Sequence, residues 1–392
     1  MKWNELTILV ISENFPPTVG GSAAWLGRIA ESWPGDVRVL SALVDGAARE
    51  ESDGHVSVRR IPFVFPSWAP DSFTSAKSYW SWIRATLRVI RENAPAVALC
   101  GRGIPEGVVA RVARRRAGVP YAILAHGEEI TTCQTSGLLR RFLAFAYRGA
   151  ALVIANSANT ARLVASCAGP EVKCVVAPPG VAAMEYATAD PADIARMKVG
   201  TQGRIVLSIG RLEERKNHVG MVRAIAELVR QGMDVTYLIG GEGDQKPAIE
   251  AAAAGLGVSG RVRLLGLVPQ SDLVPLYHAA DVFALPGIRV GGGLEGFGIV
   301  FLEAAAAGKV CIAGNSGGSG EAVLHGKTGF VVDGNDAKLL SETLGRVLSD
   351  DAMRDEMGKA AQERVRREFD WPIVLAKLRE AMLQAIAAKE PL

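Results

Sequence analysis

The sequence predicts an α/β protein built from two doubly wound domains with largely parallel sheets. Its 392 residues, of which 49 % are hydrophobic and 22 % charged, are enough for two globular domains with sizeable cores. Short apolar runs alternate with helical patterns along nearly the whole chain, which is typical of parallel sheets. A segment rich in Pro, Ala and Gly near the middle, residues 178–203, carries no strong strand and therefore suits a linker.

Seven runs in the first half have the length and apolar character of buried β-strands. They are Leu6–Ser12, Val37–Val44, Val56–Ile61, Ala96–Cys100, Tyr121–Ala125, Leu152–Ala155 and Cys174–Ala177. Six runs of the same kind follow in the second half: Ile205–Ile209, Val235–Ile239, Val262–Leu265, Val282–Leu285, Val310–Ala313 and Gly329–Val332. The predicted division is a first domain over 1–185, a second over 186–371, and a last segment, 372–392, that is helical to about Lys389.

Composition restricts where the protein works. The apolar run near the N-terminus is broken by Glu13 too soon for a signal peptide, so it is interpreted as the first strand. Since no apolar run reaches the ~18 residues needed to cross a bilayer, no membrane span is expected. The five cysteines are scattered without a Cys-x-x-Cys pair, which indicates neither a zinc site nor a disulfide framework. A reducing cytoplasm is the simplest location.

The stretch from Pro286 to Glu321 has the strongest functional signal. A strand ends at its start, a glycine-rich loop follows, and a helix is predicted from Ile299 to Ala307. Free N–H groups at a helix N-terminus beside glycines form an anion site suited to phosphate. Glu295 precedes the helix and Glu303 lies in it; carboxylates repel phosphate but accept hydrogen bonds from sugar hydroxyls. The ligand indicated is therefore a sugar nucleotide.

The pattern Glu295-x7-Glu303 within EGFGIVFLEAAAAG resembles the signature of the retaining glycosyltransferases of family 4. The resemblance covers nearly the whole chain and is strongest from about Ile205 to Asp333. It implies the GT-B fold: two Rossmann-like domains facing across a cleft, with a C-terminal helix crossing back to the first domain. It also implies that the first domain takes the acceptor and the second the donor. The donor-binding residues expected in this stretch are Glu295, Gly296, Phe297, Gly298, Ile299 and Glu303.

Two cations follow the first strand of the second domain. Arg211 and Lys216 resemble the pair that grips the donor diphosphate in this family. Negative charge grows on the diphosphate when the sugar leaves. Some glycosyltransferases neutralise it with a metal held by Asp-x-Asp, a triplet that this sequence does not contain. Two fixed cations can do the same, so neither a metal nor another cofactor is expected. The resemblance places Val268 beside the base. Three neighbours in the cation segment are expected to face solvent: Glu213, Glu214 and Arg215.

Two motifs of the first domain fit the same interpretation. Gly20-Gly21 precedes a helical run over Ala23–Ser32, and in similar enzymes this loop contacts the donor phosphate and the acceptor. The alternative is a plain turn. His126 follows a strand, at the edge where active sites of this architecture lie. The resemblance implies that its ring or carbonyl stabilises positive charge at the anomeric carbon; the alternative is a histidine that only orders its loop.

The first domain carries a net positive charge in a chain whose formal net charge is +3, because residues 1–185 hold 20 Lys and Arg against 15 Asp and Glu. Eight arginines lie between Arg84 and Arg116 against Glu92 and Glu106. An aromatic cluster lies nearby: Trp68, Tyr79, Trp80 and Trp82. Together they suit an anionic membrane surface or an anionic acceptor. The alternatives are a solvated helix face and core packing. Peripheral attachment to the inner face of the membrane is thus expected, and nucleic acid is not an expected partner.

The function predicted is retaining, metal-independent transfer of a hexose from a nucleotide sugar to a hydroxyl of a cell-envelope lipid or glycan. The catalytic residues expected are His126, Arg211, Lys216 and Glu295. The loop Ala313–Gly318 and the EGFGIV motif resemble most those of bacterial mannosyltransferases acting on phosphatidylinositol lipids, which favours GDP-mannose. Three alternatives stay open: a UDP-sugar-dependent glucosyl or N-acetylglucosaminyl transferase, an epimerase or phosphorylase of the same fold, and an inactive nucleotide-sugar-binding protein.

Overall fold

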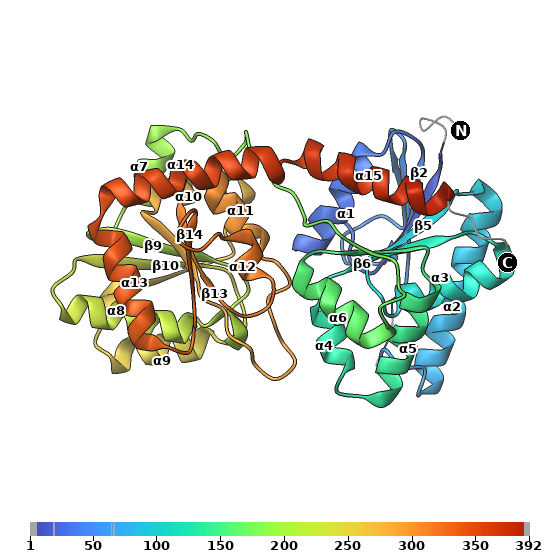
Figure 1. Ribbon diagram of the computed structural model, residues 1–392, viewed down its shortest axis with the longest axis horizontal. Coiled ribbons are helices and arrows are strands. Elements are labelled where there is room, and N and C mark those ends of the chain that lie inside the picture. Colours follow the sequence, from blue (N-terminus) through green and yellow to red (C-terminus); the bar gives the residue numbers. More distant parts are fainter. Residues whose placement is uncertain (1–5, 19, 64, 66, 388–392) are drawn as a thin grey trace. The chain divides into compact units, whose positions relative to one another are not determined.

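The computed structural model describes residues 6–18, 20–63, 65 and 67–387, and the chain divides into two compact units, each with its own sheet (Figure 1). Unit 1 comprises Met1–Pro179 together with Val374–Leu392, and unit 2 comprises Gly180–Ile373. Each sheet is parallel except for one edge strand in unit 1, and helices connect its strands. The α/β architecture with two Rossmann-like sheets is therefore confirmed.

The sheet of unit 1 has eight strands in the order β3-β4-β2-β1-β5-β6-β7-β8. They are β1 (Ile8–Ser12), β2 (Val37–Ala42), β3 (Glu50–Asp53), β4 (Val56–Ile61), β5 (Val97–Cys100), β6 (Tyr121–Ala125), β7 (Leu152–Ala155) and β8 (Cys174–Val176). Strand β1 lies between β2 and β5, pairing Ile8 with Val37 on one side and with Val97 on the other. The chain reverses its direction of winding at β1, and ligands of such sheets bind at the carboxyl ends of the strands at this switch point.

All seven strands expected in the first half form, with ends that shift by at most two residues. Strand β1 begins at Ile8 rather than Leu6, and β2 ends at Ala42 rather than Val44. The sequence analysis missed β3. Its residues, EESD, are all exposed and pair antiparallel with β4 at the sheet edge. An edge strand with no apolar residue has no hydrophobic pattern by which to recognise it.

Six helices of unit 1 connect its strands: α1 (Gly21–Ser32), α2 (Phe73–Asn93), α3 (Glu106–Ala117), α4 (Glu128–Cys133), α5 (Gly137–Gly149) and α6 (Ala158–Ala168). Serine side chains accept hydrogen bonds from the first turns of three of them, α2, α5 and α6. This is the usual way to satisfy backbone donors at a helix start. For α6 the capping residue is Ser157, whose Oγ atom accepts from the N–H of Thr160 at 3.0 Å.

The last helix, α15 (Trp371–Ala387), belongs to unit 1 from Val374 onward. There the Nη2 atom of Arg379 donates a hydrogen bond to the carbonyl of Ser32 at 2.9 Å. The expected return of the C-terminal helix to the first domain is thus confirmed. Its expected end near Lys389 lies outside the described residues.

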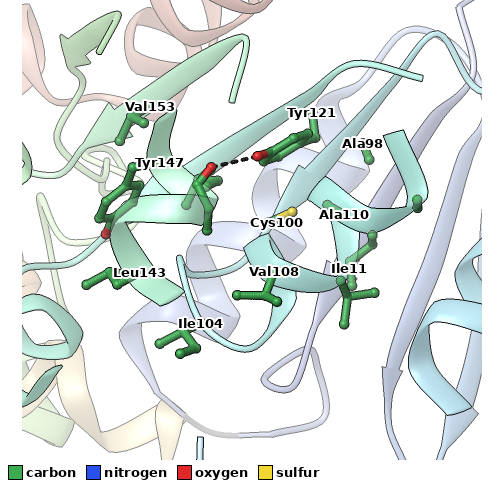
Figure 2. Packing of buried hydrophobic residues seen from close by; sticks show 14 of the residues in the cluster. Ile11, Ala98, Cys100, Ile104, Val108, Ala110, Tyr121, Leu143, Tyr147 and Val153 are labelled. Atoms are coloured by element: carbon green, nitrogen blue, oxygen red, sulfur yellow. Dashed lines mark hydrogen bonds between the residues drawn. The ribbon is translucent and has the colours of Figure 1, made fainter. Parts of the chain in front are cut away.

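The core of unit 1 places α3 and α5 tightly against the sheet (Figure 2). The buried hydroxyl of Tyr121 donates to the carbonyl of Ala146 at 2.6 Å, which ties β6 to α5. Glycine permits the close approach of the neighbouring loop, because a Cβ atom at Gly103 would lie 2.4 Å from the Cδ1 atom of Leu143. This packing attaches the loop after β5 and the start of β6 to α5.

The sheet of unit 2 has six parallel strands in the order β11-β10-β9-β12-β13-β14. They are β9 (Arg204–Ile209), β10 (Val235–Gly240), β11 (Val262–Gly266), β12 (Val282–Leu285), β13 (Val310–Gly314) and β14 (Gly329–Val332). These are the six strands predicted, each within one residue at either end. Strand β9 lies between β10 and β12, so the switch point of this sheet lies between β9 and β12.

The helices of unit 2 are α7 (Pro191–Met197), η2 (Glu214–Lys216), α8 (His218–Arg230), α9 (Lys246–Gly255), η3 (Ser259–Arg261), α10 (Gln270–Ala279), α11 (Ile299–Ala306), α12 (Ser319–Ala322), α13 (Ala337–Ser349) and α14 (Asp351–Glu368). Helix α11 joins β12 to β13, which pair in parallel from Val282 opposite Val310. The predicted βαβ unit is therefore confirmed. The short helix α7 lies within the segment 178–203.

Candidate functional site

The candidate donor site lies at the switch point of unit 2. Lys216 ends the short helix η2 in the loop after β9, and Glu295 lies in the loop after β12. The Nζ atom of Lys216 donates a hydrogen bond to the Oε2 atom of Glu295 and forms an ion pair with it. Their side chains are only 10 % and 15 % exposed. The fold thus brings together two residues that are 79 positions apart in the chain and that were both predicted to contact the donor.

Arg215 belongs to the same cluster, which corrects the expectation that it faces solvent. Its side chain is 11 % exposed, and its Nη1 atom lies 3.3 Å from the Oε2 atom of Glu295. Its Nε atom lies 2.8 Å from the Oε2 atom of Glu213, which is half-buried rather than solvent-facing. Glu214 is exposed, as expected. A loop of this kind has no 3.6-residue or two-residue period, so its sequence does not indicate which side chains face inward.

Arg211 joins the cluster through Glu213 and is itself exposed. Its Nη1 atom lies 2.6 Å from the Oε1 atom of Glu213, and its side chain is 66 % exposed. The contacts form a chain of alternating charge, in the order Arg211, Glu213, Arg215, Glu295, Lys216. Three cations and two carboxylates leave one net positive charge, which suits an anionic ligand such as a diphosphate.

The two carboxylates of the signature pattern have opposite electrostatic environments. Burial would raise the pKa of Glu295, but the charges of Lys216 and Arg215 outweigh it and hold the pKa below its usual range. Burial raises the pKa of Glu303 on α11, although Tyr277 and Tyr186 oppose this through hydrogen bonds. The hydroxyl of Tyr277 donates to the Oε2 atom of Glu303 at 2.6 Å. Glu295 is thus held by cations, whereas Glu303 is held by phenol hydroxyls.

The backbone between Glu295 and α11 needs glycine. Gly298 begins the helix with φ +90°, and a Cβ atom there would lie 2.6 Å from the ring of Phe301. The carbonyl of Glu295 accepts a hydrogen bond from the N–H of Gly318 at 2.8 Å, which joins the two loops that flank α11. Phe297 is buried against Phe369. The predicted donor-binding segment from Gly296 to Ile299 is therefore fixed on both sides, with the N-terminus of α11 at its end.

Val268, the residue expected beside the base, follows β11 and is half-buried. It packs on the end of β10, because a Cβ atom at Gly240 would lie 2.6 Å from the Cγ2 atom of Val268. No contact in the structure tests its expected role, which stays a prediction.

In unit 1, both the ring and the carbonyl of His126 are engaged. The Nε2 atom lies 2.8 Å from the carbonyl oxygen of Gly101; since a carbonyl can only accept, the ring donates this hydrogen bond from Nε2. The Nδ2 atom of Asn156 donates to the carbonyl of His126 at 3.2 Å. The backbone N–H of His126 donates to Glu129 at 3.0 Å, and its ring meets that of Trp25 edge-on. His126 thus orders its loop; a direct role at the donor sugar stays a prediction.

Gly20 and Gly21 lie at the exposed start of α1, as the sequence indicates. Gly20 has φ +148°, a conformation that residues with a side chain rarely adopt, while a Cβ atom there would meet nothing within 4 Å. Its glycine is therefore required by backbone conformation and not by crowding. The phosphate contact expected of this pair stays a prediction.

A second charged cluster lies at the switch point of unit 1, and sequence reasoning missed it. Arg102 and Glu106 follow β5 and had been counted with the basic surface, but Arg102 is 17 % exposed and Glu106 is fully buried. The backbone N–H of Glu13, after β1, donates to the Oε1 atom of Glu106 at 3.0 Å. Arg102 lies 3.6 Å from Glu106 and 3.2 Å from the carboxylate of Glu13. Burial raises the pKa of Glu106 to about 7, against the opposing charge of Arg102.

The aromatic cluster of unit 1 separates into core and surface. Tyr79 and Trp82 are buried in the core, where the hydroxyl of Tyr79 donates to the carbonyl of Trp68 at 2.5 Å. Trp80 is 57 % exposed, and the guanidinium of Arg84 lies 4.3 Å from the centre of its ring. Core packing therefore accounts for part of the cluster and an exposed aromatic–basic face for the rest.

Solved structures with the same architecture identify the fold. A sucrose-phosphate synthase from Thermosynechococcus elongatus superposes with a TM-score of 0.85 at 20 % identity, covering 98 % of this chain and all of that one. Anabaena HepE, solved in complex with UDP and glucose, gives a TM-score of 0.78 at 20 % identity over 97 % of this chain and all of its own. The chain thus has the GT-B fold.

The class that this fold and site define is a glycosyltransferase. Residues 20–180 match the family model of the glycosyl transferase 4-like domain, and residues 191–364 match that of glycosyl transferases group 1. A GDP-mannose-dependent alpha-(1-6)-phosphatidylinositol monomannoside mannosyltransferase of Mycolicibacterium smegmatis is 30 % identical over 386 residues, covering 96 % of this chain and 98 % of that relative. A GDP-mannose-dependent monoacylated alpha-(1-6)-phosphatidylinositol monomannoside mannosyltransferase of Corynebacterium glutamicum is 29 % identical over 377 residues, covering 94 % and 96 %. The chain belongs to glycosyltransferase family 4.

Two features are absent from the described residues, 6–18, 20–63, 65 and 67–387. Within that part of the chain, no helix combines the length and the apolar character needed to cross a membrane. The same part holds no group of three or more His, Cys, Asp or Glu side chains placed to bind a metal ion.

Proposed function

We propose that this glycosyltransferase moves a mannosyl residue from GDP-mannose to a hydroxyl of a phosphatidylinositol-type glycolipid, retaining the anomeric configuration and using no metal. The observation that carries the proposal is the buried pair of Lys216 and Glu295 at the switch point of unit 2, next to the N-terminus of α11. The donor and acceptor are suggested by the relatives at about 30 % identity, which use GDP-mannose and phosphatidylinositol mannosides.

In the proposed mechanism, Lys216 and Arg211 stabilise the negative charge that grows on the leaving diphosphate. Glu295, kept ionised by its two cations, accepts hydrogen bonds from hydroxyls of the sugar. Glu303 accepts them from the ribose, and the N–H groups at the start of α11 contact the phosphate. The acceptor attacks from the face that the diphosphate leaves, and the leaving phosphate takes the acceptor proton. For His126 and for the loop of Gly20 and Gly21, contacts with the sugar and with the phosphate are likewise proposed.

The choice of donor is tested by comparing ligands. GDP or GDP-mannose at about 100 times its dissociation constant stabilises the folded protein by about 2.7 kcal/mol, which a thermal melt detects. UDP, UDP-glucose and UDP-N-acetylglucosamine serve as matched controls. If only the UDP compounds stabilise the protein, the donor is a UDP-sugar and not GDP-mannose. The assignment to the glycosyltransferases would not change.

The acceptor and the competing functions are tested by incubating the protein with labelled GDP-mannose and phosphatidylinositol mannosides. Label should move to the lipid fraction. Epimerised nucleotide sugar would indicate an epimerase, and phosphate-dependent release of sugar phosphate a phosphorylase. Binding with neither transfer nor slow donor hydrolysis would indicate an inactive binding protein.

For the acceptor lipid we propose peripheral binding to anionic membrane at the cytoplasmic face, through one face of α2. Phe73 is 85 % exposed and Trp80 57 %, and Lys77 and Arg84 are exposed at the same helical spacing. Apolar rings beside basic side chains suit an interface with anionic headgroups.

Co-sedimentation with vesicles tests this face. Binding should be stronger to vesicles containing phosphatidylglycerol than to neutral ones, and it should weaken with salt, since screening acts over about 8 Å at physiological ionic strength. The double variant Phe73→Ser, Trp80→Ser should lose most of it. Equal binding to neutral and anionic vesicles, or full binding by the double variant, would contradict the membrane proposal.

A further inference from the structure

Arg215 connects the two loops that build the candidate donor site. It lies in η2, between Glu214 and Lys216, and it contacts the loop after β12 through both its backbone and its side chain. Its carbonyl accepts a hydrogen bond from the N–H of Ile288 at 2.8 Å. Its Nη1 atom lies 3.3 Å from the carbonyl oxygen of Leu294 and 3.3 Å from the carboxylate of Glu295. The loop is thus attached to Arg215 near both of its ends.

Glycines in the facing loop make room for this arginine. A Cβ atom at Gly287 would lie 3.1 Å from the carbonyl oxygen of Arg215, and one at Gly293 would lie 3.3 Å from its Cδ atom. Both distances are tighter than ordinary van der Waals contact. The glycine-rich composition of this loop is therefore explained in part by the close approach of Arg215.

A carboxylate on its own loop fixes the direction of the Arg215 side chain. Glu213 accepts from the Nε atom of Arg215 at 2.8 Å with one oxygen and from Arg211 at 2.6 Å with the other. A guanidinium held at Nε by one carboxylate keeps its Nη1 atom in one place, because the group is planar and rigid. Lysine would keep the charge at this position but would lose the second point of attachment.

We propose that Arg215 is a positioning residue for the transfer reaction: it holds the carboxylate of Glu295 in its place beside Lys216, and Glu213 holds Arg215. The inference rests on the proposed function and deepens it. Arg215 itself need not touch the donor, since its Nε and Nη1 atoms are directed at Glu213, Glu295 and the carbonyl of Leu294. A misplacement of about 1 Å can cost on the order of 100-fold in rate, so loss of this attachment should affect turnover more than binding.

The experiment compares Arg215→Lys and Arg215→Gln with the unchanged protein, measuring the dissociation constant of GDP, kcat for transfer, and kcat as a function of pH. The matched control is Arg230→Gln, which removes a 75 % exposed arginine that pairs with Glu227 on a helix of the same unit. We expect both Arg215 variants to lower kcat by about 10- to 100-fold and to change GDP affinity by less than about threefold. The control should change neither.

The pH profile separates positioning from a general loss of structure. Arg215→Gln removes one of the cations that keep Glu295 ionised, so the acid limb of kcat should move to higher pH, whereas Arg215→Lys should leave it nearly in place. Glu213→Gln should lower kcat in the same direction, and its effect should not add to that of Arg215→Gln.

Four results would overturn the inference. Turnover like that of the control means that Arg215 positions nothing. A fall in GDP affinity as large as the fall in kcat means that it binds the donor directly. Equal loss in both variants with an unmoved acid limb means that it only maintains structure. If the unchanged protein binds neither GDP nor UDP, the proposed function itself fails, a result distinct from the other three.

Discussion

Replacing Glu106 should change how the stability of unit 1 depends on pH. Its carboxyl is fully buried, and one of its oxygens, Oε2, has no hydrogen-bond partner. The groups that face it are Arg102 on its own loop, Glu13 from the loop after β1, Cys100 at the end of β5 and Tyr79 from α2. Burial raises the pKa of Glu106 from an ordinary value of 4.5 to about 7, and Arg102 only partly offsets this.

The sign follows from proton binding. Because the folded protein binds the proton of Glu106 more tightly than the unfolded chain does, this group favours folding most at low pH. Its contribution is lost as pH rises from 4.5 through about 7. At about 1.4 kcal/mol for each factor of ten, the whole change is on the order of 3 kcal/mol, and most of it falls between pH 5 and pH 8. Glu106→Gln keeps an acceptor for the N–H of Glu13 and removes the titration.

Urea unfolding followed by tryptophan fluorescence is a suitable assay, because six of the seven tryptophans precede residue 180 and so report mainly on unit 1. The free energy of unfolding of Glu106→Gln minus that of the unchanged protein should rise by roughly 2–3 kcal/mol from pH 5 to pH 8. Glu50→Gln, which removes a 71 % exposed carboxylate from β3, is the control for general charge effects. A difference for Glu106→Gln that stays constant across this range would refute the reasoning.

The remaining predictions concern the donor site. Lys216→Ala should lower kcat by about 10²–10³, which is the usual effect of removing one preorganised hydrogen-bond donor to a developing oxyanion. Its circular dichroism spectrum should stay native, because Arg215 still pairs with Glu295. Arg211→Ala should cost less than Lys216→Ala in the same transfer assay, since its side chain is 66 % exposed and water weakens its field. Transfer should persist in EDTA. If EDTA abolishes the activity and added magnesium restores it, the proposed metal independence is contradicted. The product should keep the donor's anomeric configuration by NMR, and an inverted product would contradict the mechanism.

Most of the fold could be predicted from the sequence, because buried strands of a parallel sheet appear as short apolar runs. The thirteen predicted strands all form, and the one that was missed, β3, contains no apolar residue. The sequence also singled out Glu295, by the glycine loop and the start of a helix beside it, and Lys216, by its resemblance to a family motif; their contact with the donor stays a prediction. What could not be predicted is the direction of side chains in loops. Arg215 was assigned to solvent, and Arg102 and Glu106 to a basic surface, because counting charges along the chain does not reveal which of them meet at a switch point.

The two switch points differ in charge balance, and this difference explains why the two units should bind different ligands. In unit 2 three cations surround two carboxylates, so the cluster is positive and Glu295 remains ionised. In unit 1 the guanidinium of Arg102 lies beside both Glu13 and Glu106, so one cation faces two carboxyl groups. Burial raises the pKa of Glu106 to about 7. A diphosphate is stabilised by the first arrangement, whereas the second has no net positive charge to attract it and offers carboxyl oxygens that suit a ligand rich in hydroxyls. GDP added to the labelled protein should therefore shift the NMR signals of the loops after β9 and β12 before any near Arg102. Shifts that appear first around Arg102 would show that the charge balance does not decide which unit takes the donor.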